Sequence, residues 1–384
     1  VTYTISSIDS NATKVIFDTQ SSNFTYGSVG SGSGSKVGNT VEITGWTGTS
    51  VTVTLTYTTA ATYSNRANVT STSATYTDSA WSSTDSIVIS ASFHFAGDTY
   101  GFHAGCSNGT QTVINRFAFS ANTTATDWGD LNEPRHGVAG CSSSTDGFAV
   151  SGHGGSSYRN SIDKFSFSSS AGASDHGDIN NNTFGLAGSS STTHGFASGG
   201  RYSDNVIDKF AFSSNVTASD HGDLTYNSHD NPTGNTSTDY GFVSGGSDSG
   251  TYFNTINKFA FSSNTTASDH GDLTQARHWA AGASSSTAGY TVGGHIGSNK
   301  VNTIDYYSFS SNTTATDHGD LIDNMHGMSG QSSTDYGFTA GGQTLGPPEV
   351  DTVVQRFAFS SNTTATDWGD LAEVGTSGAG GYQV

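Results

Sequence analysis

The sequence has little charge, little cysteine and little proline, and it has no long apolar segment. Only 12% of its 384 residues are charged, against about 25% in ordinary globular domains. Its two cysteines, Cys106 and Cys141, are too few for a disulfide framework and the wrong set for a zinc site. They could pair with each other, but we expect two buried free thiols. Because no run of about 20 apolar residues occurs, we expect no membrane insertion.

The chain is also poor in positive charge. Its 13 Lys and Arg stand against 32 Asp and Glu, for a formal net charge of −19. Such a surface repels phosphates and anionic lipids, which argues against nucleic acid and membranes as partners. No basic-then-apolar leader follows Val1, so we expect a targeting segment to be absent or already removed. With 22 Phe, 16 Tyr and 5 Trp, the chain has enough aromatic surface for a folded core.

An internal repeat runs through most of the sequence. A Gly-Asp pair recurs at spacings of 45 to 50 residues, with its glycines at 129, 177, 222, 271, 319 and 369. Gly-aromatic and Phe-x-Phe pairs recur with it, as in Gly195-Phe196 and Phe210/Phe212. Each period holds four short segments of strand character, and none has apolar residues at helical spacing. This pattern predicts the four-stranded blade of an all-β propeller.

The amino-acid sequence of the repeat resembles that of a known family. Kelch repeats have an aromatic strand ending in Gly-Gly, a strand ending in an aromatic residue, and a Trp-bearing strand. Here these correspond to Gly195–Gly200, Val206–Phe212 and the strand around His221. Over roughly residues 93–384 the sequence is similar to kelch-type repeats of structural and tail-fibre proteins of viruses of marine bacteria. The resemblance implies a kelch-like β-propeller in a virion or outside the cell, but fold alone does not define a biochemical role.

The number of blades follows from counting strands, which we name a, b, c and d in the order of the repeat. Six c–d pairs are present, but there are seven b-like segments, the last at Gly381–Val384. A c–d hairpin from residues 62–85 would complete a seventh blade and close the ring without free edges. We therefore favour seven blades, with six as the alternative.

Residues 1–60 lack the repeat. Alternating strands are predicted at Thr2–Ile5, Val15–Asp18, Val41–Thr44 and Val51–Tyr57, with a flexible loop at Gly30–Lys36. They predict a small N-terminal β-sandwich that serves as an anchoring or docking module. The propeller then occupies residues 61–384, in which residues 61–92 could complete the last blade.

Residues that recur in every repeat are predicted to serve the structure of the blade. The aspartates around Gly-Asp, such as Asp127 and Asp130, suggest calcium ligands, but six copies cannot all form one active site. We expect them to accept backbone N–H bonds and to pair with a basic position on strand c; repeated calcium sites are the alternative, and no other cofactor is indicated. The basic position holds Arg116, Lys164, Lys209, Lys258 and Arg356. The place of Trp128 and Trp368 is taken by His176, His221, His270 and His318, which we expect to be planar packing residues.

Residues that break the repeat are free to serve function. In a propeller the b–c and d–a loops lie on one face, and here these loops are diverse, whereas the a–b and c–d turns are uniform. Diverse loops with aromatic residues and arginine on a rigid scaffold are typical of recognition surfaces; the alternative is drift in loops without a ligand. The predicted binding residues are Arg135, His153, Tyr158, Arg159, Arg201, Tyr202, Tyr226, His229, Tyr252, Arg277, Trp279 and His295.

These features favour a non-catalytic virion structural or adhesion protein. Its variable face would bind a host-surface glycan, an envelope protein or a neighbouring virion protein, and multiple copies in an assembly would add avidity. A purely architectural capsid-decoration or fibre protein is one alternative.

The other alternative is a propeller enzyme, either a glycosidase or a copper oxidase-like protein. A sialidase needs three convergent arginines, for which Arg135, Arg201 and Arg277 are available, but Glu133 is the one glutamate nearby. Neither cysteine lies in a variable loop, as a copper site of the galactose-oxidase kind would need. His-Glu-x-x-His and nucleophile-elbow motifs are absent from the sequence.

Overall fold

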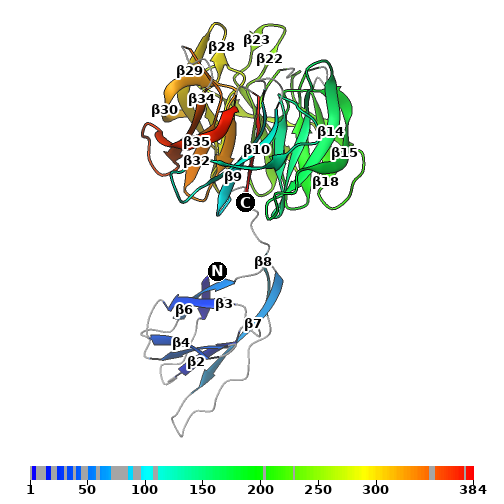
Figure 1. Ribbon diagram of the computed structural model, residues 1–384. Helices are drawn as coiled ribbons and strands as arrows, with labels where there is room; N and C mark the ends of the chain where they lie inside the picture. Colours follow the sequence, from blue (N-terminus) through cyan, green and yellow to red (C-terminus); the bar gives the residue numbers. More distant parts are fainter. Residues whose placement is uncertain are drawn as a thin grey trace. The chain divides into compact units, whose positions relative to one another are not determined.

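The computed structural model divides the chain into two compact units, Val1–Ser92 and Phe93–Val384. It describes residues 97–106, 111–201, 205–227, 230–345, 351–375 and 378–384, together with eight strands between residues 2 and 89. All elements in these ranges are strands (Figure 1). Within the described part of the chain there is accordingly no helix that could cross a membrane.

The first unit contains two antiparallel sheets. One has the order β1-β6-β3 and the other β4-β5-β2-β7-β8. The strands are β1 (Thr2–Ile5), β2 (Lys14–Asp18), β3 (Phe24–Val29), β4 (Ser33–Val37), β5 (Thr40–Thr44), β6 (Val51–Tyr57), β7 (Ala61–Thr70) and β8 (Asp85–Ile89). The period-2 alternation that predicted β5 places Val41 and Ile43 in the core. The predicted loop at residues 30–36 was wrong in its second half, because Ser33–Val37 pairs with β5.

The second unit is a β-propeller of six four-stranded blades, which we number I to VI. Blade I contains β9 (Tyr100–Cys106), β10 (Gln111–Ala118), β11 (Thr126–Asp130) and β36 (Gly380–Gln383). Blade II contains β12 (Ala139–Ser142), β13 (Asp146–His153), β14 (Tyr158–Ser166) and β15 (Ser174–Thr183). Blade III contains β16 (Ala187–Ser190), β17 (His194–Ser198), β18 (Val206–Ala211) and β19 (Ser219–Asp223).

The other three blades repeat this order, with short additions in their b–c loops. Blade IV contains β20 (Thr233–Thr236), β21 (Tyr240–Ser244), β24 (Thr255–Ala260) and β25 (Ser268–Asp272), plus the hairpin of β22 (Ser247–Asp248) and β23 (Thr251–Tyr252). Blade V contains β26 (Ala281–Ser284), β27 (Ala288–Val292), β29 (Asn299–Ser308) and β30 (Thr316–His326), and β28 (His295–Ile296) pairs with β29. Blade VI contains β31 (Ser329–Ser332), β32 (Tyr336–Ala340), β34 (Asp351–Ala358) and β35 (Thr366–Gly375), while β33 (Gln343–Thr344) pairs with β30.

The ring closes within blade I, where β36 from the C-terminus pairs with β9, so that the C-terminus lies beside β9 in Figure 1. One blade is therefore split between distant segments, as predicted, but the favoured count of seven was wrong and the alternative of six is correct. The error lay in taking Gly381-Tyr382 for a b strand, whereas it is an innermost a strand. Residues 62–85 do not supply a hairpin to the propeller, because β7 pairs with β2 and β8 in the first unit.

Neighbouring blades are joined by a ring nitrogen on strand d. Each donates a hydrogen bond of 2.8–3.0 Å to a carbonyl of strand c in the next blade, as His221 Nε2 does to Ala260 O. The donors are Trp128, His176, His221, His270, His318 and Trp368. This confirms that histidine and tryptophan are equivalent packing residues here, since both offer a planar ring with an N–H at its edge.

The Gly-Asp motif forms a local turn within strand d. The first aspartate accepts the backbone N–H of the glycine two residues later, as in Asp220 and Gly222 at 2.7 Å, and this occurs in all six blades. The basic position on strand c has a different partner from the predicted aspartates, because its cations lie over aromatic rings. The Arg356 guanidinium carbon is 3.6 Å from the ring centroid of Trp368, and that of Arg116 is 3.8 Å from the ring centroid of Trp128.

Six glycines bring the innermost strands into backbone contact around the central axis. A Cβ atom added to Gly234 would stand 2.1 Å from the carbonyl oxygen of Gly188, and the same contact recurs at 2.1–2.3 Å between every neighbouring pair. This inner glycine ring consists of Gly140, Gly188, Gly234, Gly282, Gly330 and Gly381. It surrounds a cavity of about 100 Å³ in the channel.

Candidate functional site

The d–a and b–c loops meet around one mouth of the channel, where six residues form a closed ring of backbone hydrogen bonds. Each N–H donates to the carbonyl of the equivalent residue one blade earlier, at 2.6–2.9 Å. All six residues have a left-handed conformation, with φ between 51° and 88°. This mouth ring consists of Gly137, Gly185, Asn231, Trp279, Gly327 and Gly378.

Trp279 is the exception in the mouth ring. Glycine adopts a left-handed conformation freely and asparagine tolerates it, but for other L-residues it costs about 1–2 kcal/mol. The indole Nε1 of Trp279 is also buried without a hydrogen-bond partner, and an unpaired buried donor costs about 1–3 kcal/mol. Backbone strain of this kind concentrates at functional sites, because elsewhere it is easily removed by mutation.

Opposite blades II and V carry the same unusual residues at a constant offset of 142 positions. An arginine and a histidine occupy each d–a loop, a second histidine begins each b–c segment, and an aspartate lies on each strand c. The equivalent pairs are Arg135 and Arg277, His136 and His278, His153 and His295, and Asp163 and Asp305. In both blades the loop histidines form an isolated β-bridge. Since the other blades lack this set, the loop face has two related sites three blades apart.

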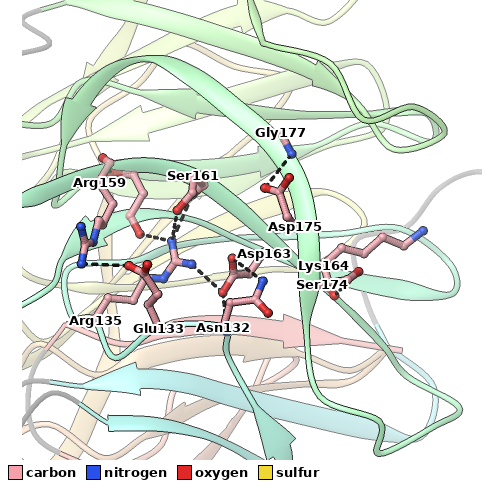
Figure 2. Close-up of polar contacts among 11 residues, drawn as sticks. Asn132, Glu133, Arg135, Arg159, Ser161, Asp163, Lys164, Ser174, Asp175 and Gly177 are labelled. Carbon is pink, nitrogen blue, oxygen red and sulfur yellow. Dashed lines mark hydrogen bonds and ion pairs between the residues drawn. The ribbon is translucent and has the colours of Figure 1, made fainter.

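Beneath each site a buried arginine anchors the d–a loop, and Figure 2 shows the one in blade II, Arg135. Arg135 lies 2.5 Å from Asp163 and donates to the carbonyls of Ser151 and Ser161 at 3.1 Å. Arg277 forms the same ion pair with Asp305. Neither arginine side chain is more than 1% exposed. These two predicted binding residues therefore lie inside the scaffold, where they hold the loops that carry other side chains.

In blade II the aromatic side chains above the anchor stack on one another. Tyr158 and Phe184 are parallel within 2°, with centroids 5.2 Å apart, and His153 packs beside them. The exposed Arg201 lies over Phe184 at 5.7 Å. Arg159 forms a half-exposed ion pair with Glu133 at 2.8 Å (Figure 2). We call His136, His153, Tyr158, Phe184 and Arg201 the blade II cluster.

In blade V the corresponding side chains form a chain of rings in edge-to-face contact. Tyr252 contacts His278 at a centroid distance of 4.9 Å, His278 contacts His295, and His295 contacts His326. Trp279 packs on His326 at 5.0 Å with an interplanar angle of 41°. We call these five residues the blade V cluster. All of them lie at the mouth of the channel or in the loops beside it.

The mouth itself is a small cavity of about 70 Å³, lined by the mouth ring and the residue after each of its members. Pockets that enclose a small-molecule ligand measure about 300–1,000 Å³. The cavity therefore does not enclose a ligand of that size. A ligand on this face would lie across the rim and contact the two clusters.

The histidines of the blade V cluster are held in their neutral form. Burial lowers the pKa of His278 to about 4, with His295 adding to the effect. Burial also lowers the pKa of His326 to about 3, with Lys300 and then the neighbouring histidines adding to the effect. Burial also lowers the pKa of His103, which lies between blades and contacts Ser329, to about 4. At neutral pH these rings therefore act as uncharged hydrogen-bonding groups.

We expect the stability of the propeller to fall between pH 6.5 and pH 4. The unfolded chain binds a proton at each of these three histidines near pH 6.5 and the folded chain does not, so stability rises with pH in this window. Since each pKa unit corresponds to about 1.4 kcal/mol, His103 alone contributes a loss of about 3 kcal/mol by pH 4. Urea unfolding at pH 7.0 and 5.2 tests this.

The variant His326→Phe provides the control, because Phe184 occupies the equivalent position at blade II. It should lose less stability than the wild type between these two pH values. Equal losses in the two proteins would contradict a role of His326 in the pH dependence.

The structure brings together only part of the predicted binding set. His153, Tyr158 and Arg201 lie in one cluster and Tyr252, Trp279 and His295 in the other, while Tyr202 and His229 lie outside the described residues. Tyr226 packs on Phe253 and donates to Gly245 O, so it belongs to neither cluster. The prediction missed His136, His278, Phe184 and His326. The 142-residue offset between the two His–His pairs was the signal that could have found the first two.

Three observations bear on the enzyme alternatives. Arg135 and Arg277 are buried in separate ion pairs on opposite blades, so they do not converge with Arg201 as a sialidase would require. Both cysteines are buried free thiols, as predicted, and burial raises the pKa of Cys141 to about 12. Among the residues described, no group of three or more His, Cys, Asp or Glu is arranged to hold a metal ion.

No family model matches the chain, and no curated protein matches it.

Proposed function

We propose that this chain is a non-catalytic adhesion protein whose propeller binds a host-surface glycan through its b–c and d–a loop face. The observation that carries the proposal is the pair of aromatic and histidine clusters beside the channel mouth. The opposite face carries the same turns in each blade, whereas this face places unlike residues on equivalent scaffolds. Aromatic rings offer stacking surfaces to sugars, and neutral histidines offer hydrogen bonds to hydroxyl groups.

The setting we propose is a virion or another extracellular assembly, with the first unit, Val1–Ser92, as the anchoring or docking module in place of the predicted residues 1–60. The resemblance to kelch-type repeats of viral tail-fibre proteins supports this setting. The acidic surface, with a net charge of −19, supports a partner that is neither nucleic acid nor anionic lipid. Several copies in one assembly would raise a weak single-site affinity through avidity.

We expect the full chain to bind on an array of neutral, sialylated and sulfated glycans, and a bulky group on the loop face to block that binding. Because the described thiols of Cys106 and Cys141 are buried, a new surface cysteine can be modified selectively with a polyethylene-glycol maleimide. Ser298→Cys lies on the exposed tip of a b–c loop in blade V, and Ser263→Cys lies in an exposed c–d turn of the opposite face.

Modified Ser298→Cys should lose array binding, and modified Ser263→Cys should keep it. The reverse pattern would place the ligand on the uniform face and contradict the proposal. If the chain binds no glycan, the adhesion proposal fails and a purely architectural role becomes the better explanation.

A further inference from the structure

The strained Trp279 has no structural role that a smaller residue does not fulfil. At the same position in four other blades the mouth ring is closed by glycine, and in blade IV by Asn231, with hydrogen bonds of the same length. Trp279 therefore keeps an unfavourable backbone conformation and an unpaired buried indole N–H at a position where glycine is sufficient. Stability therefore does not explain the tryptophan, and backbone strain of this kind concentrates at functional sites.

The surroundings of Trp279 indicate what it contacts. It lines the 70 Å³ cavity at the mouth. The rings of His278, His295 and His326 contact one another beside it, and His278 also contacts Tyr252, so that the five side chains form one aromatic surface. Of the nearby cations, Arg277 is paired with Asp305, and Lys300 Nζ donates to Thr344 O at 2.6 Å while its charge adds to burial in lowering the pKa of His295 and His326. A partly exposed aromatic surface that also carries neutral histidines suits an uncharged ligand with an apolar face and hydroxyl groups at its edge.

The blade II cluster shows what the same scaffold looks like without this feature. Gly137 takes the place of Trp279, and the rings of Tyr158 and Phe184 stack face to face on each other. The two opposite sites thus share a buried Arg–Asp anchor and a His–His pair, but they differ in the tryptophan. This difference makes blade II an internal reference for blade V.

We propose that Trp279, with Tyr252, His278 and His295 beside it, is the stacking site for an uncharged pyranose unit of the bound glycan. The inference rests on the proposed function, and it names both the site and the class of sugar. The sugar lies across the rim with its C–H face on the indole, because the mouth cavity is too small to enclose it. The histidine rings exchange hydrogen bonds with its hydroxyl groups.

The variants Trp279→Gly and Trp279→Asn test this, since both residues occupy the same position in other blades. The probes are the methyl glycosides of glucose, galactose and mannose, with sialyllactose as the anionic comparison, all measured by saturation-transfer NMR titration. We expect the wild type to bind at least one neutral glycoside more tightly than sialyllactose. Both variants should lose at least tenfold in affinity while their melting temperature stays the same or rises.

Tyr240→Ala is the control, because Tyr240 is exposed beside the a–b turn of blade IV on the opposite face, and it should keep the wild-type affinity. Full affinity of Trp279→Gly for the neutral glycoside would overturn the assignment of Trp279 and leave the proposed function in place. A large drop in its melting temperature would also overturn it, because Trp279 would then be structural. Preference for sialyllactose would overturn the class of sugar, whereas absence of binding on the glycan array would remove the proposed function itself.

Discussion

The variant Gly234→Ala should destabilise the propeller by more than about 3 kcal/mol or prevent it from folding. The added Cβ would stand 2.1 Å from Gly188 O, a backbone atom of the next blade. Overpacking usually costs about 1–3 kcal/mol when side chains can move aside. Here the blade itself would have to move, and five equivalent contacts around the same axis oppose that shift. Urea unfolding of the full chain measures the effect.

Gly250→Ala is the control for this variant. Gly250 lies in the β22–β23 turn with a positive φ of 87° and nothing within 4 Å of its Cβ position. Alanine there should cost only the backbone penalty of about 1–2 kcal/mol. If Gly234→Ala were no more harmful than Gly250→Ala, backbone contact between the innermost strands would not be what limits this position.

Arg277→Met should cost about 3–5 kcal/mol, because it leaves the carboxylate of Asp305 buried without its cation. Asp305 is fully buried, and its remaining partners are the backbone N–H and hydroxyl of Thr274. The half-exposed pair of Arg159 and Glu133 is the contrast, and Arg159→Ala should cost less than about 1 kcal/mol.

The chain contains its own uncharged version of this pair. Met325 and Gln355 hold the equivalent positions between blades V and VI, with Gln355 Nε2 2.9 Å from Met325 Sδ and Gln355 Oε1 accepting from Ile322 N. The double variant Arg277→Met with Asp305→Gln should therefore recover most of the stability that the single variant loses. If the double variant is as unstable as Arg277→Met, the ion pair stabilises the fold by more than the mutual neutralisation of Arg277 and Asp305. Urea unfolding of the wild type, Arg277→Met, Asp305→Gln and the double variant completes the double-mutant cycle.

Much of the blade could be predicted because its determinants are local and repeated. The Gly-Asp motif, the Phe-x-Phe pairs and the Trp/His position recur within 45 to 50 residues, so the sequence itself separates structural from variable residues. The Asp127–Gly129 turn bond is a two-residue interaction, and it was predicted correctly. The partner of Arg116 was not, because the ring of Trp128 reaches it only through the pairing of β10 with β11.

The candidate site was predicted less well because burial depends on three-dimensional neighbours. Arg135 and Arg277 looked like recognition residues in variable loops, yet each lies next to an aspartate 28 residues further along the chain. Likewise His326 joins the blade V cluster only because blade VI follows blade V around the axis. A sequence pattern shows that a residue is unusual, but it does not show which way its side chain points.

The sequence by itself determined that the chain is all-β, that its propeller is built of blades of about 48 residues, and which positions recur in each blade for structural reasons. These properties depend on strand periodicity and turn chemistry, which act over a few residues. Only the tertiary structure decided that six blades close the ring, that the C-terminal strand completes the first, and that Trp279 is strained at the channel mouth. Those properties depend on how the innermost strands meet around one axis, where contacts join residues up to about 280 positions apart.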